Sequence, residues 1–231
     1  MNNILQPNFK ALQAIIVYQQ DLDHQGDSYY LETRRIHKGR MMEGVPMTKN
    51  ALSKIVSEIK TEDIDQVYCK GFLPSNLLYQ GKNNLSVKLI WYVKSSWQNL
   101  SFSKSLGIKN GIMKVPTLIF KLNGSGLSIF ATKSDNPKKD SLLYQAPFHN
   151  IFSGGDVCMG SAKVVKSNEI NEIMKNYEKA FFQSKFTHLQ SQGSPIKGNL
   201  NTMMNSCIEI KAALPKALLK RQGKMKLKDL L

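Results

Sequence analysis

YQAPFHNIFSGGDVCMG, residues 144–160, is the stretch of this chain that decides its fold and its chemistry. Ala146-Pro147-Phe148 ends an apolar run, because proline cannot donate to the hydrogen-bond ladder of a central strand. Ser153-Gly154-Gly155-Asp156 is the densest turn signal of the sequence, since glycine readily adopts the positive φ of a tight reversal. Cys158 follows that turn and lies eight residues after Asn150.

A thiol, a glycine turn and an amide side chain at this spacing indicate acyl chemistry. The thiolate of Cys158 would attack a carbonyl carbon, and the NH₂ group of Asn150 would donate to the oxyanion that develops. Cys158 and Asn150 are therefore the candidate catalytic residues, against the alternative that Cys158 is a structural cysteine. Cys69 and Cys207 lack such a setting, and we expect them to behave as small apolar residues.

These residues resemble the active-site motif of ubiquitin-conjugating enzymes, which runs His-Pro-Asn-Ile, a short glycine-containing turn, an aliphatic residue and the catalytic cysteine. Asn150-Ile151 matches its centre and Gly155-Asp156-Val157-Cys158 its end, whereas Phe148-His149 stands where the motif has His-Pro. The whole stretch is more similar to the protein B family of the PRTRC system, a prokaryotic ubiquitin-conjugating-enzyme-like family (family D) of plasmids and mobile elements. The resemblance covers roughly residues 70–190.

The resemblance implies a function and partners. Cys158 would accept a ubiquitin-like protein as a thioester and pass it to an amine, with Asn150 stabilising the tetrahedral state. The implied partners are a ThiF-type activating enzyme, a small ubiquitin-like protein and a JAB-type peptidase. The alternative is a non-catalytic protein with the same fold, acting as an adaptor for the ubiquitin-like protein or as a DNA-binding plasmid-maintenance module.

Length and composition narrow the class of protein. A chain of 231 residues with 42% hydrophobic content is long and apolar enough to form a folded core. No apolar run approaches the ~20 residues of a membrane span, so we expect no membrane partner. Three widely spaced cysteines and four scattered histidines argue against disulfides, a metal site or a cofactor, and they favour the reducing cytoplasm.

The net charge of +15 is the compositional anomaly of the chain. Seven lysines and arginines and no acid lie between Lys211 and Lys228. This segment predicts weak, salt-dependent binding of nucleic acid, or else it is only a solubilising tail. No motif indicates how a nucleic acid would be recognised.

Periodicity predicts an α+β fold of the ubiquitin-conjugating-enzyme type, with an antiparallel meander, flanking helices and an N-terminal extension. We expect a hairpin and a helix capped by Thr48 in residues 1–65, the conjugating-enzyme-like domain in residues 66–190, and a basic tail in residues 191–231. The expected features of the central domain run along the chain as follows: a half-buried strand at residues 86–94, a long loop with one short strand at 95–113, a hairpin turning at Asn123-Gly124-Ser125-Gly126, a strand from Leu142, and an amphipathic helix from about Ser167 to Leu189.

Overall fold

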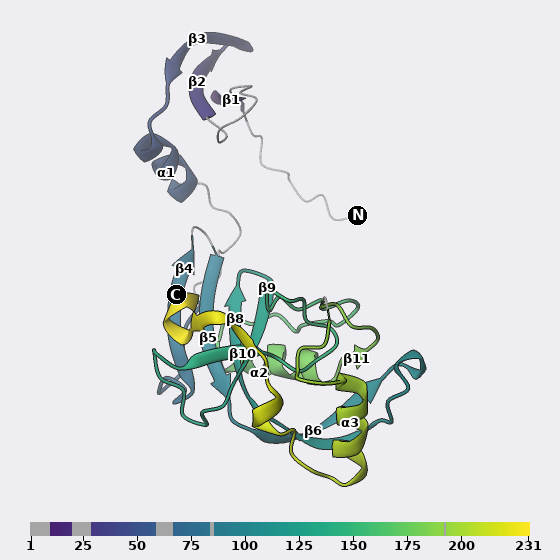
Figure 1. Ribbon diagram of the computed structural model, residues 1–231. Coiled ribbons are helices and arrows are strands. Elements are labelled where there is room, and N and C mark those ends of the chain that lie inside the picture. Colours follow the sequence, from purple (N-terminus) through teal and green to yellow (C-terminus); the bar gives the residue numbers. More distant parts are fainter. Residues whose placement is uncertain (1–9, 20–28, 59–66, 84–85, 192) are drawn as a thin grey trace, which may run out of the picture. The chain divides into compact units, whose positions relative to one another are not determined.

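The computed structural model of the protein describes residues 10–19, 29–58, 67–83, 86–191 and 193–231 (Figure 1). The chain divides into two compact units, residues 1–63 and 64–231. The predicted α+β class is confirmed, because the sheets are mostly antiparallel and the described residues include three α-helices.

The first unit contains a three-stranded antiparallel sheet, β1 (Gln13–Gln19), β2 (Tyr29–His37) and β3 (Arg40–Pro46), followed by α1 (Lys49–Glu58). The predicted pairing of the first two strands is confirmed by their register. The predicted cap is also present, because the Ala51 N–H donates to Thr48 Oγ1 at 3.2 Å. Strand β3 was not predicted, since its turn uses Lys38 and Gly39 at positive φ rather than a typical Asn-Gly pair. The apolar spacing that predicts the helix after Thr48 extends to Ile59, which lies outside the described residues.

The second unit is built on a six-stranded sheet in which every neighbouring pair is antiparallel. The strand order is β12-β10-β9-β8-β5-β4. The predicted turn is confirmed, because Asn123 pairs with Gly126 across the β8–β9 hairpin. The bounds are β4 (Leu77–Asn83), β5 (Ser86–Val93), β8 (Thr117–Asn123), β9 (Gly126–Thr132), β10 (Leu142–Gln145) and β12 (Arg221–Lys226).

Both faces of this sheet are covered. Leu89 and Trp91 of β5 lie in the main core with residues of α2 (Ile170–Phe182), and the Trp91 indole N–H donates to Glu178 at 2.8 Å. Ile90, on the opposite face, is 1% exposed. The expectation of a half-buried strand at 86–94 is therefore wrong, because the C-terminal residues cover the face that was assigned to solvent.

The segment 95–113 is not a long loop with one strand. It forms β6 (Ser96–Phe102) and contributes to β7 (Gly111–Val115), which pair antiparallel, with the short 3₁₀ helix η1 (Lys104–Leu106) between them. A second short strand, β11 (Lys185–Phe186), adds to β6 in parallel. Leu100 and Phe102 are the buried residues of β6, and four of its seven residues are Ser, Gln or Asn, so its composition is that of a loop.

Helix α2 is shorter than predicted. Glu169 caps its N-terminus, in the expected place, but the helix ends at Phe182 and not near Leu189. The Ser184 hydroxyl donates to the Phe181 carbonyl at 2.7 Å, which helps to end the helix. The chain then continues into β11, where Phe186 is fully buried beside Phe181, with ring centroids 5.9 Å apart.

Residues 191–231 belong to the second unit and do not form a separate tail. They contribute α3 (Leu200–Glu209), the 3₁₀ helices η2 (Lys216–Leu218) and η3 (Leu227–Leu230), and the edge strand β12. Leu227 and Leu230 are buried against Ile90 and Ile119 on one face of the sheet, and Figure 1 shows this yellow C-terminal segment beside β5. The composition of this segment, with widely spaced leucines among lysines, is typical of a tail. Burial of the apolar surface of the leucines nevertheless holds the segment in the second unit.

Candidate functional site

The predicted turn after Asn150 is present and is docked on the main sheet. Ile151 and Val157 form an antiparallel bridge, and the Gly155 N–H donates to the Phe152 carbonyl at 2.8 Å. The Ile129 N–H of β9 donates to the Gly155 carbonyl at 2.8 Å, which fixes the turn to the strand. Gly155 has φ +99°, and a Cβ there would lie 2.4 Å from the Phe130 ring, so both the backbone conformation and the close approach favour glycine.

This turn brings the two candidate catalytic residues together. The backbone N–H of Cys158 donates to the backbone carbonyl of Asn150 at 2.8 Å, and both residues line one pocket. Cys158 is half-buried and is a free thiol. The spacing of eight residues therefore corresponds to opposite ends of one tight reversal.

The residues around Asn150 anchor it to the core. Phe148 packs edge-on against Phe181 of α2, with ring centroids 5.0 Å apart. His149 is fully buried, and its Nε2 lies 2.8 Å from Asn201 Oδ1 of α3. Because a carboxamide oxygen only accepts, His149 Nε2 carries the proton. Burial lowers the pKa of His149, which outweighs the opposing effect of the Asn201 hydrogen bond, so this imidazole is a neutral structural group.

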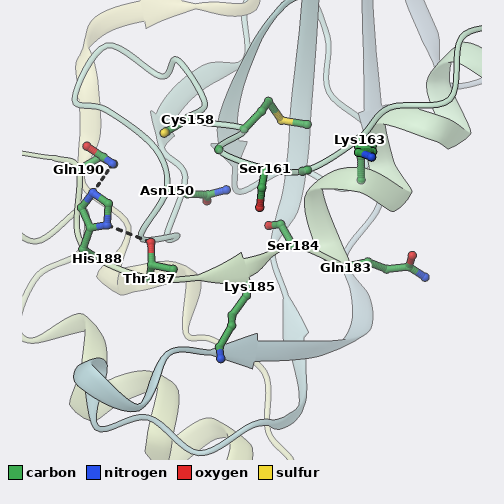
Figure 2. A pocket seen from close by; sticks show the side chains of 14 residues that line it. Asn150, Cys158, Ser161, Lys163, Gln183, Ser184, Lys185, Thr187, His188 and Gln190 are labelled. Atoms are coloured by element: carbon green, nitrogen blue, oxygen red, sulfur yellow. Dashed lines mark hydrogen bonds between the residues drawn. The ribbon is translucent and has the colours of Figure 1, made fainter.

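The pocket is open and has a volume of about 530 Å³. One wall is the segment that follows Cys158, and the other is the end of α2 continued through β11 to Gln190. The Gln190 N–H donates to the His149 carbonyl at 2.8 Å, which ties the second wall to the residue that precedes Asn150. The lining residues, most of them labelled in Figure 2, are Asn150, Cys158, Met159, Gly160, Ser161, Ala162, Lys163, Ala180, Gln183, Ser184, Lys185, Thr187, His188 and Gln190.

The side chain of Asn150 has an unusual environment. Its Oδ1 atom is buried and has no hydrogen-bond partner among the described residues. Figure 2 shows the amide extending into the pocket on the side of Ser161 and Ser184. An amide with a buried oxygen keeps its NH₂ group available to an acceptor that enters the pocket, and buried groups without partners often mark functional positions.

His188 lines the pocket, although its sequence position favoured a helix-end histidine over a role near Cys158. Thr187 Oγ1 lies 2.9 Å from His188 Nδ1, and Gln190 Nε2 contacts His188 Nε2, as the dashed lines in Figure 2 show. An amide nitrogen only donates, so Nε2 accepts and Nδ1 carries the proton. Both ring nitrogens are therefore occupied, which argues against His188 as a base in this conformation. Lys163, Lys185 and Ser184 were also missed, because no local motif marks them.

The other two thiols lie outside the pocket. Cys69 is half-buried, and its Sγ lies 3.4 Å from the Phe72 carbonyl. Cys207 is buried in α3, and burial raises the pKa of its thiol, which disfavours the thiolate. Both environments agree with the packing role expected for them.

The basic segment from Lys211 to Lys228 is largely engaged within its own unit. Lys216 pairs with Asp135 at 3.0 Å, and Lys226 and Lys228 both pair with Asp140, at 3.6 and 2.9 Å. Lys220 Nζ donates to the Ser194 carbonyl at 2.7 Å. These contacts reduce the charge available to a polyanion, so the nucleic-acid binding expected from composition stays a prediction.

Two further findings bear on the class of protein. In the described ranges, no three His, Cys, Asp or Glu side chains come together as ligands for a metal ion. None of the helices in the described part of the chain has the length and apolar character that crossing a bilayer requires.

Comparison with protein families gives a match over most of the chain. The model of prokaryotic E2 family D, E2 being the ubiquitin-conjugating enzyme class, matches residues 51–221. A comparison with curated proteins and one with solved structures found no significant match. The matched region contains the glycine turn, both candidate catalytic residues and both walls of the pocket. The resemblance of the motif to a prokaryotic ubiquitin-conjugating-enzyme-like family is therefore confirmed, and the chain belongs to prokaryotic E2 family D.

Proposed function

We propose that this protein accepts the C-terminal acyl group of a ubiquitin-like protein on Cys158 and transfers it to an amine. The observation that carries the proposal is the pairing of Asn150 and Cys158 at the two ends of one turn, with both side chains in one open pocket. Membership of an E2-like family supports it, because such proteins generally interact with activating enzymes and ubiquitin-like proteins.

In the first step, the Cys158 thiolate attacks the carbonyl carbon of the thioester that the activating enzyme carries. The S–C bond to Cys158 forms, the S–C bond to the activating enzyme breaks, and the departing thiolate takes up a proton from water. The half-exposed position of Cys158 gives a protein-bound thioester access to its sulfur.

In the second step, the acceptor amine attacks the Cys158 thioester. The resulting tetrahedral carbon carries an oxyanion, to which the Asn150 NH₂ group donates a hydrogen bond. Collapse of this state forms the amide bond and releases the Cys158 thiolate, and the amine proton goes to solvent. No Asp or Glu is among the residues that line the pocket, so the amine must arrive deprotonated or lose its proton to water.

The resemblance of residues 144–160 to the PRTRC protein B family suggests specific partners and a genetic setting for this activity. We expect a ThiF-type activating enzyme, a small ubiquitin-like protein and a JAB-type peptidase as partners, in a PRTRC system of a plasmid or mobile element. The reducing cytoplasm suits a free catalytic thiol. The competing function, an adaptor or DNA-binding module, draws its main support from charge, and four of the seven cations of the basic segment are engaged within the unit.

The test is transfer of an acyl group to the purified chain. The ubiquitin-like partner is supplied either with the activating enzyme and ATP or as a chemically prepared C-terminal thioester of a small thiol. We expect an adduct that reductant removes, located on Cys158 by mass spectrometry and abolished by Cys158→Ala. Cys69→Ala is the matched control and should keep the adduct. An adduct on Cys69 or Cys207, or none on any cysteine while the other partners react together, would contradict the proposal and favour the adaptor.

A further inference from the structure

The charges that line the pocket beside Cys158 all have one sign. Lys163 and Lys185 are exposed pocket residues, and neither has an ion pair or a hydrogen bond from its side chain within the described structure. The remaining lining residues, apart from His188, are neutral, and no carboxylate is among them. The pocket therefore has an uncompensated positive potential.

Carboxylates on the neighbouring elements are engaged elsewhere. Asp156, two residues before Cys158, accepts a hydrogen bond of 2.7 Å from the Ser128 hydroxyl. Glu178 of α2 accepts from the Trp91 indole at 2.8 Å, and Glu172 accepts from the Ser167 hydroxyl at 2.6 Å. These contacts engage three acidic side chains of the flanking segments with partners that do not line the pocket.

The contrast with the basic segment is informative. There, lysines such as Lys216 and Lys228 face Asp135 and Asp140 and are locally neutralised. At the pocket, Lys163 and Lys185 have no such counter-charge. A net charge of +15 makes an exposed lysine ordinary, but at this pocket two unpaired cations lie beside a thiol and no carboxylate lines the walls.

A positive pocket affects an acceptor amine in two ways. A protonated amine is repelled, and nearby cations lower the pKa of the amine, which favours its neutral, nucleophilic form. Carboxylates beside the amine are attracted by the same cations and bring the acceptor to the thioester. We propose that Lys163 and Lys185 select acceptor segments in which acidic residues flank the reacting amine.

This inference rests on the proposed function, but the charge of the pocket can be measured without any partner. Iodoacetate and iodoacetamide each form one thioether bond to a cysteine Sγ and release iodide, and they differ in charge. The ratio of their rates, read at each cysteine by mass spectrometry, reports the local potential. Cys69 in the same chain is also half-buried and lies outside the pocket, so it is an internal control.

We expect the ratio of the iodoacetate rate to the iodoacetamide rate to be higher at Cys158 than at Cys69. The double substitution Lys163→Glu and Lys185→Glu should lower the ratio at Cys158 by roughly tenfold at low ionic strength, and salt should weaken the effect. Lys224→Glu is the matched control, because Lys224 is exposed, belongs to the basic segment and does not line the pocket. A ratio at Cys158 that equals that at Cys69 and does not respond to the double substitution would overturn the inference.

The acceptor preference is tested by discharge. Cys158 is loaded by exchange with a Gly-Gly thioester, and the acyl group is then offered to peptides in which Glu-Lys-Glu or Gln-Lys-Gln surrounds the amine. The native protein should transfer several-fold faster to the first peptide, and the double substitution should remove or reverse that preference. Equal rates for both peptides overturn the acceptor selectivity. The selectivity is also overturned if the double substitution changes only the rate of loading from a donor thioester that contains glutamate, and not the rate of transfer to the acceptor peptides. Failure of Cys158 to load at all counts against the proposed function, while the alkylation ratio still decides the charge of the pocket.

Discussion

The backbone amide of Cys158 donates a 2.8 Å hydrogen bond to the backbone carbonyl of Asn150, and this contact closes the reversal on which the candidate site is built. It sets the separation of the two residues through the main chain and leaves both side chains free to meet a substrate. No side-chain hydrogen bond joins the two within the described structure, so the Asn150 amide is available to an arriving carbonyl oxygen. The predictions below test how this arrangement is maintained and used.

Gly155→Ala should disrupt the reversal, whereas Gly154→Ala should not. At Gly155 the backbone has φ +99° and the added Cβ would meet the Phe130 ring at 2.4 Å, while at Gly154 the nearest atom is 3.9 Å away. We expect Gly155→Ala to lower the free energy of unfolding by roughly 2 kcal/mol or more. Denaturant unfolding measures this, and acyl loading of Cys158 should slow in the same variant. Equal stability of the two variants would contradict this account of the turn.

Asn150→Ala should separate loading from discharge. If the amide stabilises the oxyanion of the transfer step, the variant still forms the Cys158 adduct but discharges it to amines about 10²–10³-fold more slowly. Single-turnover discharge, started after loading is complete, gives that rate directly. Gln183→Ala is the control, since it removes another amide that lines the same pocket. Equal slowing by both substitutions would assign the effect to pocket shape and not to an oxyanion donor.

Leu230→Ala should destabilise the second unit although Leu230 is the penultimate residue of the chain. Its side chain is 2% exposed and lies in the smaller core with Ile90 and Phe130, whereas Leu231 is 64% exposed. We expect a loss of about 2–4 kcal/mol for Leu230→Ala and little change for Leu231→Ala. Thermal or denaturant unfolding measures both. A neutral Leu230→Ala would mean that the C-terminal segment is a loosely attached tail.

His149 should make stability depend on pH. Burial lowers its folded-state pKa, so the unfolded chain binds a proton more readily than the folded protein does. This contribution is fully present above the ordinary value of 6.5 and is lost as the pH falls from there toward the folded-state pKa. The slope it adds cannot exceed about 1.4 kcal/mol per pH unit. His149→Gln, which keeps a donor toward Asn201, should flatten the slope below pH 6.5. An unchanged slope would contradict this account.

Nucleic-acid binding, if it occurs, should depend on the unpaired cations of the basic segment. Arg221 and Lys224 have no ion pair among the described residues, whereas Lys226 and Lys228 share Asp140. Replacing the first pair by glutamine should reduce the magnitude of the salt slope of DNA binding by about 0.9 for each lost phosphate contact, and replacing the second pair should reduce it less. Titration at two salt concentrations distinguishes the two pairs. Slopes in both variants that equal that of the native protein would remove this segment from the binding surface.

Local features of the sequence determined the parts of the fold that depend on neighbours along the chain. The turn at Asn123–Gly126, the apolar alternation of β5, the cap at Thr48 and the glycine reversal between Asn150 and Cys158 each follow from the conformational preferences of a few adjacent residues. Asn150 was predictable as a neighbour of the thiol for the same reason, because it lies at the other end of that reversal.

Only the tertiary structure decided the second wall of the pocket and the state of the charges. Lys185 reaches the site because β11 pairs in parallel with β6, where Lys185 faces Ser101, a contact that no local pattern encodes. Lys216, Lys226 and Lys228 of the basic segment pair with Asp135 and Asp140, while Lys163 and Lys185 have no ion pair within the described structure. Periodicity and turn chemistry act over a few residues, whereas burial and charge compensation depend on which distant segments meet, and that is settled only when the whole unit folds.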